Sequence, residues 1–206
     1  MSLHDFIYLA SQSPRRRQLL DQLGVRHQLL VPEAGAEADA AEALEAVRPG
    51  ELPADYVRRV TALKLQAARA RLKARGLPAA PILCSDTTVA IGRRILGKPA
   101  DAAEARAMLR ALSGRSHRVL TAVALAAGPR RTLAALSVST VRFAPLDDAL
   151  VDAYIASGQP FGKAGGYAIQ SQLAGWIPQV RGSYSAIMGL PLFETAQLLR
   201  QARVCF

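Results

Sequence analysis

The first residues equipped for chemistry lie in the stretch Ser11–Arg17, which reads Ser-Gln-Ser-Pro-Arg-Arg-Arg. Ser13 is a favourable N-cap and Pro14 suits the first position of a helix, so the arginines fall in its first turn. Each cation there lowers the stability of the helix by about 0.3–1 kcal/mol, because the free N–H groups already make a helix N-terminus positive. A bound phosphate would relieve this repulsion and use both the N–H groups and the guanidiniums. The stretch therefore predicts a phosphate site, with solvated arginines as the alternative.

A second candidate is the acid Asp86, which follows the apolar run 81–85. This run predicts a buried strand, and Asp86 with Thr87 is expected at its carboxyl end. Ligands bind at that edge in open α/β sheets. An acid beside a buried strand is seldom there for packing, although it could cap a turn. We expect Asp86 to face a ligand.

Lysines form a third group of candidates, because the chain has 26 basic residues but uses lysine only at Lys64, Lys73, Lys98 and Lys163. A chain that otherwise prefers arginine can keep lysine where a compact, mobile ammonium is needed. Lys64 continues the apolar stripe of a helix predicted at 54–75, so it either snorkels or reaches into a site. Lys98 stands between Gly97 and Pro99, and Lys163 shortly precedes Gly165 and Gly166, which would allow the backbone to approach a ligand closely.

Short apolar strands alternate with amphipathic helices, which predicts a single α/β domain over residues 1–206. Residues 32–53 lack periodicity and predict a loop with a helical fragment, or a flap. Strands are expected at 7–10, 28–31, 81–85, 95–96, 116–126 and 133–143, the last two as an antiparallel hairpin. Helices are expected from 14 to 23, 54 to 75, 101 to 112, 147 to 157 and from 191 onward.

The bulk composition limits the class of protein. Half of the residues are hydrophobic, which is ample for a core, but no apolar run approaches a membrane span. Residues 1–5 lead into the first strand without signal-peptide features, and Cys84 and Cys205 form no disulfide framework, so a cytoplasmic protein is expected. The net charge of +10 favours polyanionic ligands, although arginine-rich composition alone could explain it.

The motifs together resemble the Maf (septum-formation inhibitor-like) nucleotide pyrophosphatases. Residues 9–24 follow the family's opening pattern L-A-S-x-S-P-R-R-x-x-L-L-x-x-L-G almost without departure. Further segments are similar to Y-V-x-R-x-A-x-x-K-A (56–65), A-D-T-x-V (85–89), G-K-P (97–99), G-x-x-H-x-V-x-T-G-V (114–123), D-K-A-G-A-Y-G-I-Q-G (162–171) and G-S-Y-x-x-V-x-G-L-P-L (182–192). One departure is Gly162, which stands where the family has an acid.

The resemblance implies a Maf/ITPase-like fold, with a mixed, partly antiparallel central sheet flanked by helices and two lobes around the active-site cleft. It implies hydrolysis of a nucleoside triphosphate to the monophosphate and diphosphate, with Mg²⁺ or Mn²⁺ as cofactor. Asp86 would be the catalytic base or a metal ligand, and Glu37 would share the metal, with Glu33 as the weaker candidate. The implied substrate-binding residues are Ser11, Arg15, Arg16, Lys64, Thr87, Lys98, Lys163 and Gln170.

Within the family, these motif forms resemble the branch acting on dTTP and UTP, in which Arg15, Thr87 and Gln170 would set base choice. A pyrophosphatase of the 7-methyl-GTP type is the alternative. A nucleic-acid-binding module and a nucleotide sensor without catalysis are the rivals from other classes. The chain has no helix-turn-helix, zinc or RNA-recognition signature, so neither a specific nucleic acid nor a membrane is expected as partner. The family is often dimeric, and His117 is expected to be a structural hydrogen-bonder.

Overall fold

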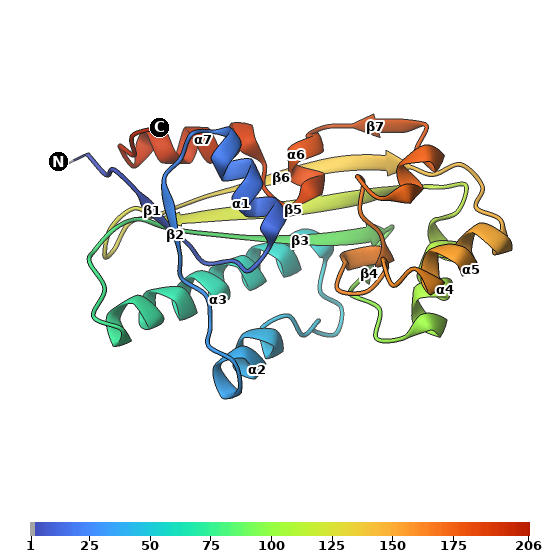
Figure 1. The fold of residues 1–206 in the computed structure, drawn as a ribbon, viewed down its shortest axis with the longest axis horizontal. Coiled ribbons are helices and arrows are strands. Elements are labelled where there is room, and N and C mark those ends of the chain that lie inside the picture. Colours follow the sequence, from blue (N-terminus) through green and yellow to red (C-terminus); the bar gives the residue numbers. More distant parts are fainter. Residues whose placement is uncertain (1–2) are drawn as a thin grey trace.

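A single mixed sheet organises the computed structural model, which describes residues 3–206 (Figure 1). Met1 and Ser2, the start of the segment without signal-peptide features, lie outside the described residues. The strand order is β2-β1-β3-β5-β6-β7, and β4 pairs with β3. The strands are β1 (Ile7–Leu9), β2 (His27–Leu29), β3 (Ile82–Ile91), β4 (Arg94–Leu96), β5 (Ser116–Ala126), β6 (Thr132–Arg142) and β7 (Gln179–Arg181).

Strand β1 is parallel to β2 and β3, and all other pairs are antiparallel. The predicted mixed, partly antiparallel sheet is therefore confirmed. The helices are α1 (Pro14–Gln22), α2 (Ala36–Ala43), α3 (Pro53–Ala74), α4 (Ala102–Leu112), α5 (Asp148–Ala156), α6 (Tyr184–Met188) and α7 (Leu192–Gln201), with 3-10 turns η1 (Ala164–Gly166) and η2 (Gln172–Trp176). No helix among residues 3–206 is long and apolar enough to cross a bilayer.

Helices cover both faces of the sheet because side chains alternate along its strands. Cys84 of β3 belongs to a buried cluster with residues of α3, whereas its neighbour Leu83 packs with residues of α1 and α7. Figure 1 shows α3 beneath the strands, α7 above them and α1 crossing them. Since Asp86 is two residues beyond Cys84, it faces α3.

A separate core lies at the other end of the long strands. Val89 of β3 and Phe143, just after β6, pack there with residues of α4 and α5. Figure 1 shows α4 and α5 far from β1 and α7 along the sheet. The helices therefore gather into two groups that share one sheet, and the middle of β3 lies between them.

Most of the helices and strands expected from the sequence begin and end within about two residues of the observed ones. The expected end of β3 at Ser85 is wrong. The strand continues because residues 82–90 all pair with β5, and the β-branched side chains of Thr87, Thr88 and Val89 suit a strand. Asp86 thus lies in mid-strand. It is still beyond the end of the parallel strand β1, whose last partner on β3 is Leu83.

The structure confirms the expected structural hydrogen bond of His117. Its Nε2 lies 2.6 Å from the Tyr167 hydroxyl, and its ring stacks on Phe143 with centroids 5.5 Å apart. The imidazole is 2% exposed, and burial lowers its pKa to about 4. His117 is therefore neutral in the folded protein at neutral pH.

This low pKa predicts acid sensitivity. The unfolded chain binds a proton on His117 below about pH 6.5, whereas the folded protein binds it only near pH 4. His117 therefore leaves the free energy of unfolding unchanged above pH 6.5 and lowers it progressively as the pH falls from 6.5 toward 4. At about 1.4 kcal/mol per pH unit, the loss reaches about 3 kcal/mol. Urea unfolding of His117→Gln should show a shallower fall between pH 6.5 and 4 than the wild type. Parallel pH curves for the two proteins would contradict the assignment.

Candidate active site

A cleft of about 1150 Å³ lies between the two groups of helices. Its walls come from the β1–α1 turn, the segment after α2, α3, the middle of β3, the loop after β4, and segments 161–170 and 187–189. The sequence-predicted site residues that line it are Ser11, Arg15, Arg16, Lys64, Asp86, Thr87, Lys98, Lys163 and Gln170. These predicted site residues span 159 positions in sequence, from Ser11 to Gln170, and they meet in one cavity.

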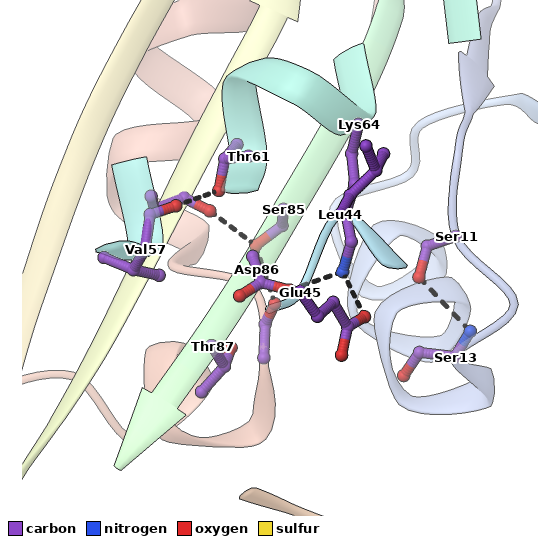
Figure 2. A network of polar contacts seen from close by, with 12 residues as sticks. Ser11, Ser13, Leu44, Glu45, Val57, Thr61, Lys64, Ser85, Asp86 and Thr87 are labelled. Carbon is purple, nitrogen blue, oxygen red and sulfur yellow. Dashed lines mark hydrogen bonds and ion pairs between the residues drawn. The ribbon is translucent and has the colours of Figure 1, made fainter. Parts of the chain in front are cut away.

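Lys64 joins two carboxylates at the centre of the cleft (Figure 2). Its Nζ donates to Asp86 Oδ1 at 2.6 Å and to Glu45 Oε1 at 2.7 Å, and Lys98 Nζ donates to Glu45 Oε2 at 2.6 Å. Burial lowers the pKa of Lys64, but Asp86 and Glu45 outweigh burial and raise it overall. Burial raises the pKa of Glu45, but Lys64 and Lys98 outweigh burial and lower it overall. Lys64 and Glu45 are therefore both charged at neutral pH.

Helical spacing explains how Lys64 reaches this position. Val57 and Val60 are fully buried on the face of α3 that meets the sheet, and Lys64 lies one turn beyond Val60. At that point the sheet presents the carboxylate of Asp86 instead of an apolar side chain. The sequence leaves two interpretations of Lys64, in which its side chain either snorkels or reaches into a site. The structure supports the second.

The N-terminus of α1 leaves its donors free for a ligand. Ser13 occupies the N-cap position, but its hydroxyl makes no capping bond. Ser11 Oγ instead accepts hydrogen bonds from Ser13 N at 3.2 Å and from Arg16 Nη1 at 3.0 Å. With both lone pairs used, the hydroxyl of Ser11 can donate its proton into the cleft. The first turn of α1 and the preceding Ser11 thus present N–H and O–H donors that suit an anion.

Cations crowd this side of the cleft. Arg16 Nε donates to Gly189 O at 2.8 Å, and Arg15 Nε donates to Met188 O at 3.3 Å. Burial lowers the pKa of Arg16 and nearby Arg15 lowers it further, against the attraction of Asp86. Burial, followed by the charge of Arg15, also lowers the pKa of Lys163. Like charges held this close create a strongly positive site for an anion.

Two hydrogen bonds determine whether the Thr87 hydroxyl donates or accepts toward its neighbour Thr121. The Thr121 hydroxyl donates to Ala186 O at 2.7 Å, and the Thr87 hydroxyl lies 3.0 Å from the oxygen of Thr121. Because the Thr121 proton is used, Thr87 must be the donor in this pair. Its oxygen is therefore left as a hydrogen-bond acceptor at the wall of the cleft.

The glycines of segment 161–170 allow close packing, but not in the way expected. Gly165 and Gly166 were predicted to let the backbone approach a ligand. A Cβ on Gly165 would instead lie 2.9 Å from the Val89 side chain, and the φ of Gly165 is +70°. The close approach at Gly165 is thus to β3, and it fixes the segment that carries Lys163 and Gln170 against the sheet.

Gly165→Ala should therefore destabilise the protein by about 2–4 kcal/mol, through a left-handed backbone and a clash in the core. Gly162→Ala is the matched control, since its φ is +72° but nothing lies within 4 Å of its Cβ position. It should cost only about 1 kcal/mol. Chemical denaturation measures both values. Equal costs at the two glycines would contradict the packing role.

The structure does not bring Glu37 to Asp86. Glu37 accepts hydrogen bonds from Arg71 Nε and, at 3.3 Å, from Arg75 Nη2, while exposed Glu33 pairs with Arg75. The second carboxylate near Asp86 is Glu45, which sequence reasoning missed. Acidic residues recur throughout 33–51 without periodicity, so no sequence signal distinguishes Glu45 from its neighbours.

The chain is similar to known proteins over nearly its whole length. The dTTP/UTP pyrophosphatase of Polaromonas sp. (strain JS666 / ATCC BAA-500) is 62% identical over 202 residues, covering 98% of each chain. That of Ralstonia nicotianae (strain ATCC BAA-1114 / GMI1000) is 61% identical, covering 98% of this chain and 96% of the relative. A solved HAM1 protein from Coxiella burnetii shares the fold, with a TM-score of 0.50 at 16% identity, covering 97% of this chain and all of that one. The family model described as Maf-like protein matches residues 6–202, and the chain belongs to this family.

Proposed function

We propose that the protein is a nucleoside triphosphate pyrophosphatase that hydrolyses dTTP and UTP to the monophosphate and pyrophosphate, in the cytoplasm. The observation that carries the proposal is the single cleft in which Asp86 meets cations from four separate parts of the chain. The full-length relatives named dTTP/UTP pyrophosphatase support the same activity. Arg15, Arg16 and Lys163 hydrogen-bond to backbone carbonyls and, within residues 3–206, to no carboxylate. A triphosphate would supply the negative charge that these three cations lack.

The donor set fits Mg²⁺ or Mn²⁺ bound together with the substrate. Within residues 3–206 no group of three metal-ligating side chains occurs, but Asp86 and Glu45 both contact Lys64 Nζ. Mg²⁺ characteristically uses one or two carboxylates and completes its shell with phosphate oxygens and water. We therefore assign the metal-binding role to Asp86 and Glu45 in place of Glu37. A cation bound there would polarise phosphate oxygens and the attacking water.

The side chains divide the reaction between them. Arg16 and the donors of Ser11 hold phosphates at the N-terminus of α1, while Lys64, Lys98 and Lys163 neutralise the remaining charge. Asp86 accepts a proton from water as the water oxygen bonds to the α-phosphorus. The bond from the α-phosphorus to its bridging oxygen breaks, and pyrophosphate leaves with that oxygen.

Polar groups at the cleft wall favour a pyrimidine imide. Uracil and thymine present an N–H between two carbonyl oxygens. The oxygen of Thr87 is an acceptor for such an N–H, and the amide of Gln170 and the guanidinium of Arg15 supply donors for the carbonyls. Cytosine has an acceptor where the imide has its N–H, so it would face Thr87 with the wrong polarity.

A nucleotide panel tests the proposal. The purified protein is incubated with UTP, dTTP, CTP, ATP, GTP and 7-methyl-GTP, with and without Mg²⁺ or Mn²⁺, and pyrophosphate release is measured. UTP and dTTP should be preferred by at least about tenfold in kcat/KM over CTP, which corresponds to about 1.4 kcal/mol. A preference for 7-methyl-GTP or another purine would overturn the base assignment, and absence of pyrophosphate from every nucleotide would overturn the activity.

A further inference from the structure

The segment that carries Glu45 has no apolar anchor of its own. Helix α2 contains no buried residue, and the chain from Leu44 to Glu51 is at most partly buried. Such a segment cannot be held by hydrophobic packing, so other contacts must decide where its side chains lie. The position of Glu45 at Lys64 and Lys98 therefore needs a polar explanation.

Arg59 of α3 supplies most of that explanation. Its Nη2 donates to Ala46 O at 2.9 Å, and its Nη1 lies 3.5 Å from Leu44 O, so the guanidinium contacts the carbonyls on both sides of Glu45. The same guanidinium binds Glu51 through two bonds, from Nε at 2.6 Å and from Nη2 at 2.7 Å. This bidentate pair orients the fork of Arg59 before it meets the backbone.

Tyr56, one turn earlier on α3, holds the remaining carbonyl. Its hydroxyl donates to Glu45 O at 2.9 Å, and the guanidinium of Arg59 lies 5.6 Å from the centroid of its ring. Leu44 is the C-cap of α2, so these carbonyls lie at or just beyond the end of that helix. Carbonyls at a helix C-terminus lack intrahelical donors, and a cation is favoured there.

We propose that Arg59, together with Tyr56, is a positioning residue that holds the backbone at 44–46 so that the carboxylate of Glu45 reaches the catalytic cleft. Neither Arg59 nor its carboxylate partner Glu51 lines the cleft. Arg59 therefore acts on the reaction only through Glu45, and its kinetic importance rests on the proposed pyrophosphatase activity. Its effect on the position of segment 44–46 is independent of that activity.

Arg59→Gln should lower kcat/KM for UTP by about 10- to 30-fold with little loss of thermal stability, because the buried face of α3 is unchanged. Arg69→Gln is the matched control. Arg69 lies on the same helix and also binds backbone carbonyls, those of Gly128 at 2.9 Å and Pro129 at 2.7 Å, but in the β5–β6 loop away from the cleft. It should retain wild-type kinetics. Full activity of Arg59→Gln would overturn the proposal.

A double-mutant cycle separates positioning from a general structural role. If Arg59 acts through Glu45, Arg59→Gln should cost nothing more in a Glu45→Gln background. Additive losses would show that Arg59 acts independently of Glu45 and would overturn the proposal.

Amide hydrogen exchange provides a readout that needs no activity. Exchange at 44–52 should speed up in Arg59→Gln but not in Arg69→Gln, whereas unchanged exchange at 44–52 would overturn the proposal. If the wild type releases no pyrophosphate while this segment responds as expected, the proposed function fails and the positioning role stands.

Discussion

Asp86→Asn should lower kcat for UTP and dTTP by about 10³-fold, while KM stays within about threefold of the wild type. The loss corresponds to about 4 kcal/mol of transition-state stabilisation. Asparagine keeps the size of the side chain, and its amide oxygen can still accept a hydrogen bond from Lys64, but it cannot take a proton from water. Initial rates of pyrophosphate release over a range of substrate concentrations would separate kcat from KM.

The control for this variant is its fold. Asp86 lies in mid-strand, where its backbone pairs with Ala122 of β5, and that pairing does not depend on the side chain. Circular dichroism and binding of a non-hydrolysable UTP analogue should therefore remain close to wild type. Retention of more than a few per cent of activity by a folded Asp86→Asn protein would remove Asp86 from the role of general base.

The elements of this fold were predictable wherever a local signal was strong. Asp101 at an N-cap with Glu104 three residues later predicted α4, and in the structure Asp101 accepts the N–H of Glu104 at 2.8 Å. Period-two alternation predicted the β5–β6 hairpin to within one residue at each end. These signals lie within a few residues of the structure that they determine, so one sequence is enough to find them.

Long-range pairing limited the prediction elsewhere. The length of β3 depends on β5, whose paired residues lie 28 to 44 positions away in sequence, so the apolar run that ends at Ser85 understated the strand. Individual cleft residues were nevertheless found, because Ser11, Lys64 and Asp86 lie in recognisable motifs. Their shared location could be expected only from the family resemblance.

Glu45 illustrates a second limit. Its segment has no hydrophobic period, and its place is decided by hydrogen bonds from Tyr56 and Arg59 on another helix. Glu37, the residue that the family resemblance favours, binds Arg71 and Arg75 instead. Where ionic contacts alone position a loop, spacing within the loop carries little information about which acid faces the site.

Replacement of Lys64 by methionine should have the second largest effect, with a fall of about 100-fold in kcat/KM for UTP, because the cleft loses the cation nearest to Asp86. Methionine preserves the aliphatic length but leaves Asp86 and Glu45 as two facing carboxylates without their shared ammonium. We expect a loss of about 1–3 kcal/mol in the free energy of unfolding, measured by urea denaturation without divalent ions. Lys73→Met, exposed in the last turn of the same helix, should change neither quantity.

The same variant tests the metal site without catalysis. In the wild type the ammonium of Lys64 occupies both carboxylates, so a divalent cation must compete with it for their oxygens. In Lys64→Met, Asp86 has lost its ammonium partner and Glu45 keeps only Lys98, so the two carboxylates gain more from Mg²⁺ or Mn²⁺. Ligand binding to the native state raises its stability. The melting temperature of Lys64→Met should therefore rise more on addition of millimolar Mg²⁺ than that of the wild type or Lys73→Met. An equal response of all three proteins would show that Asp86 and Glu45 do not form a cation site, even if Asp86 remains the base.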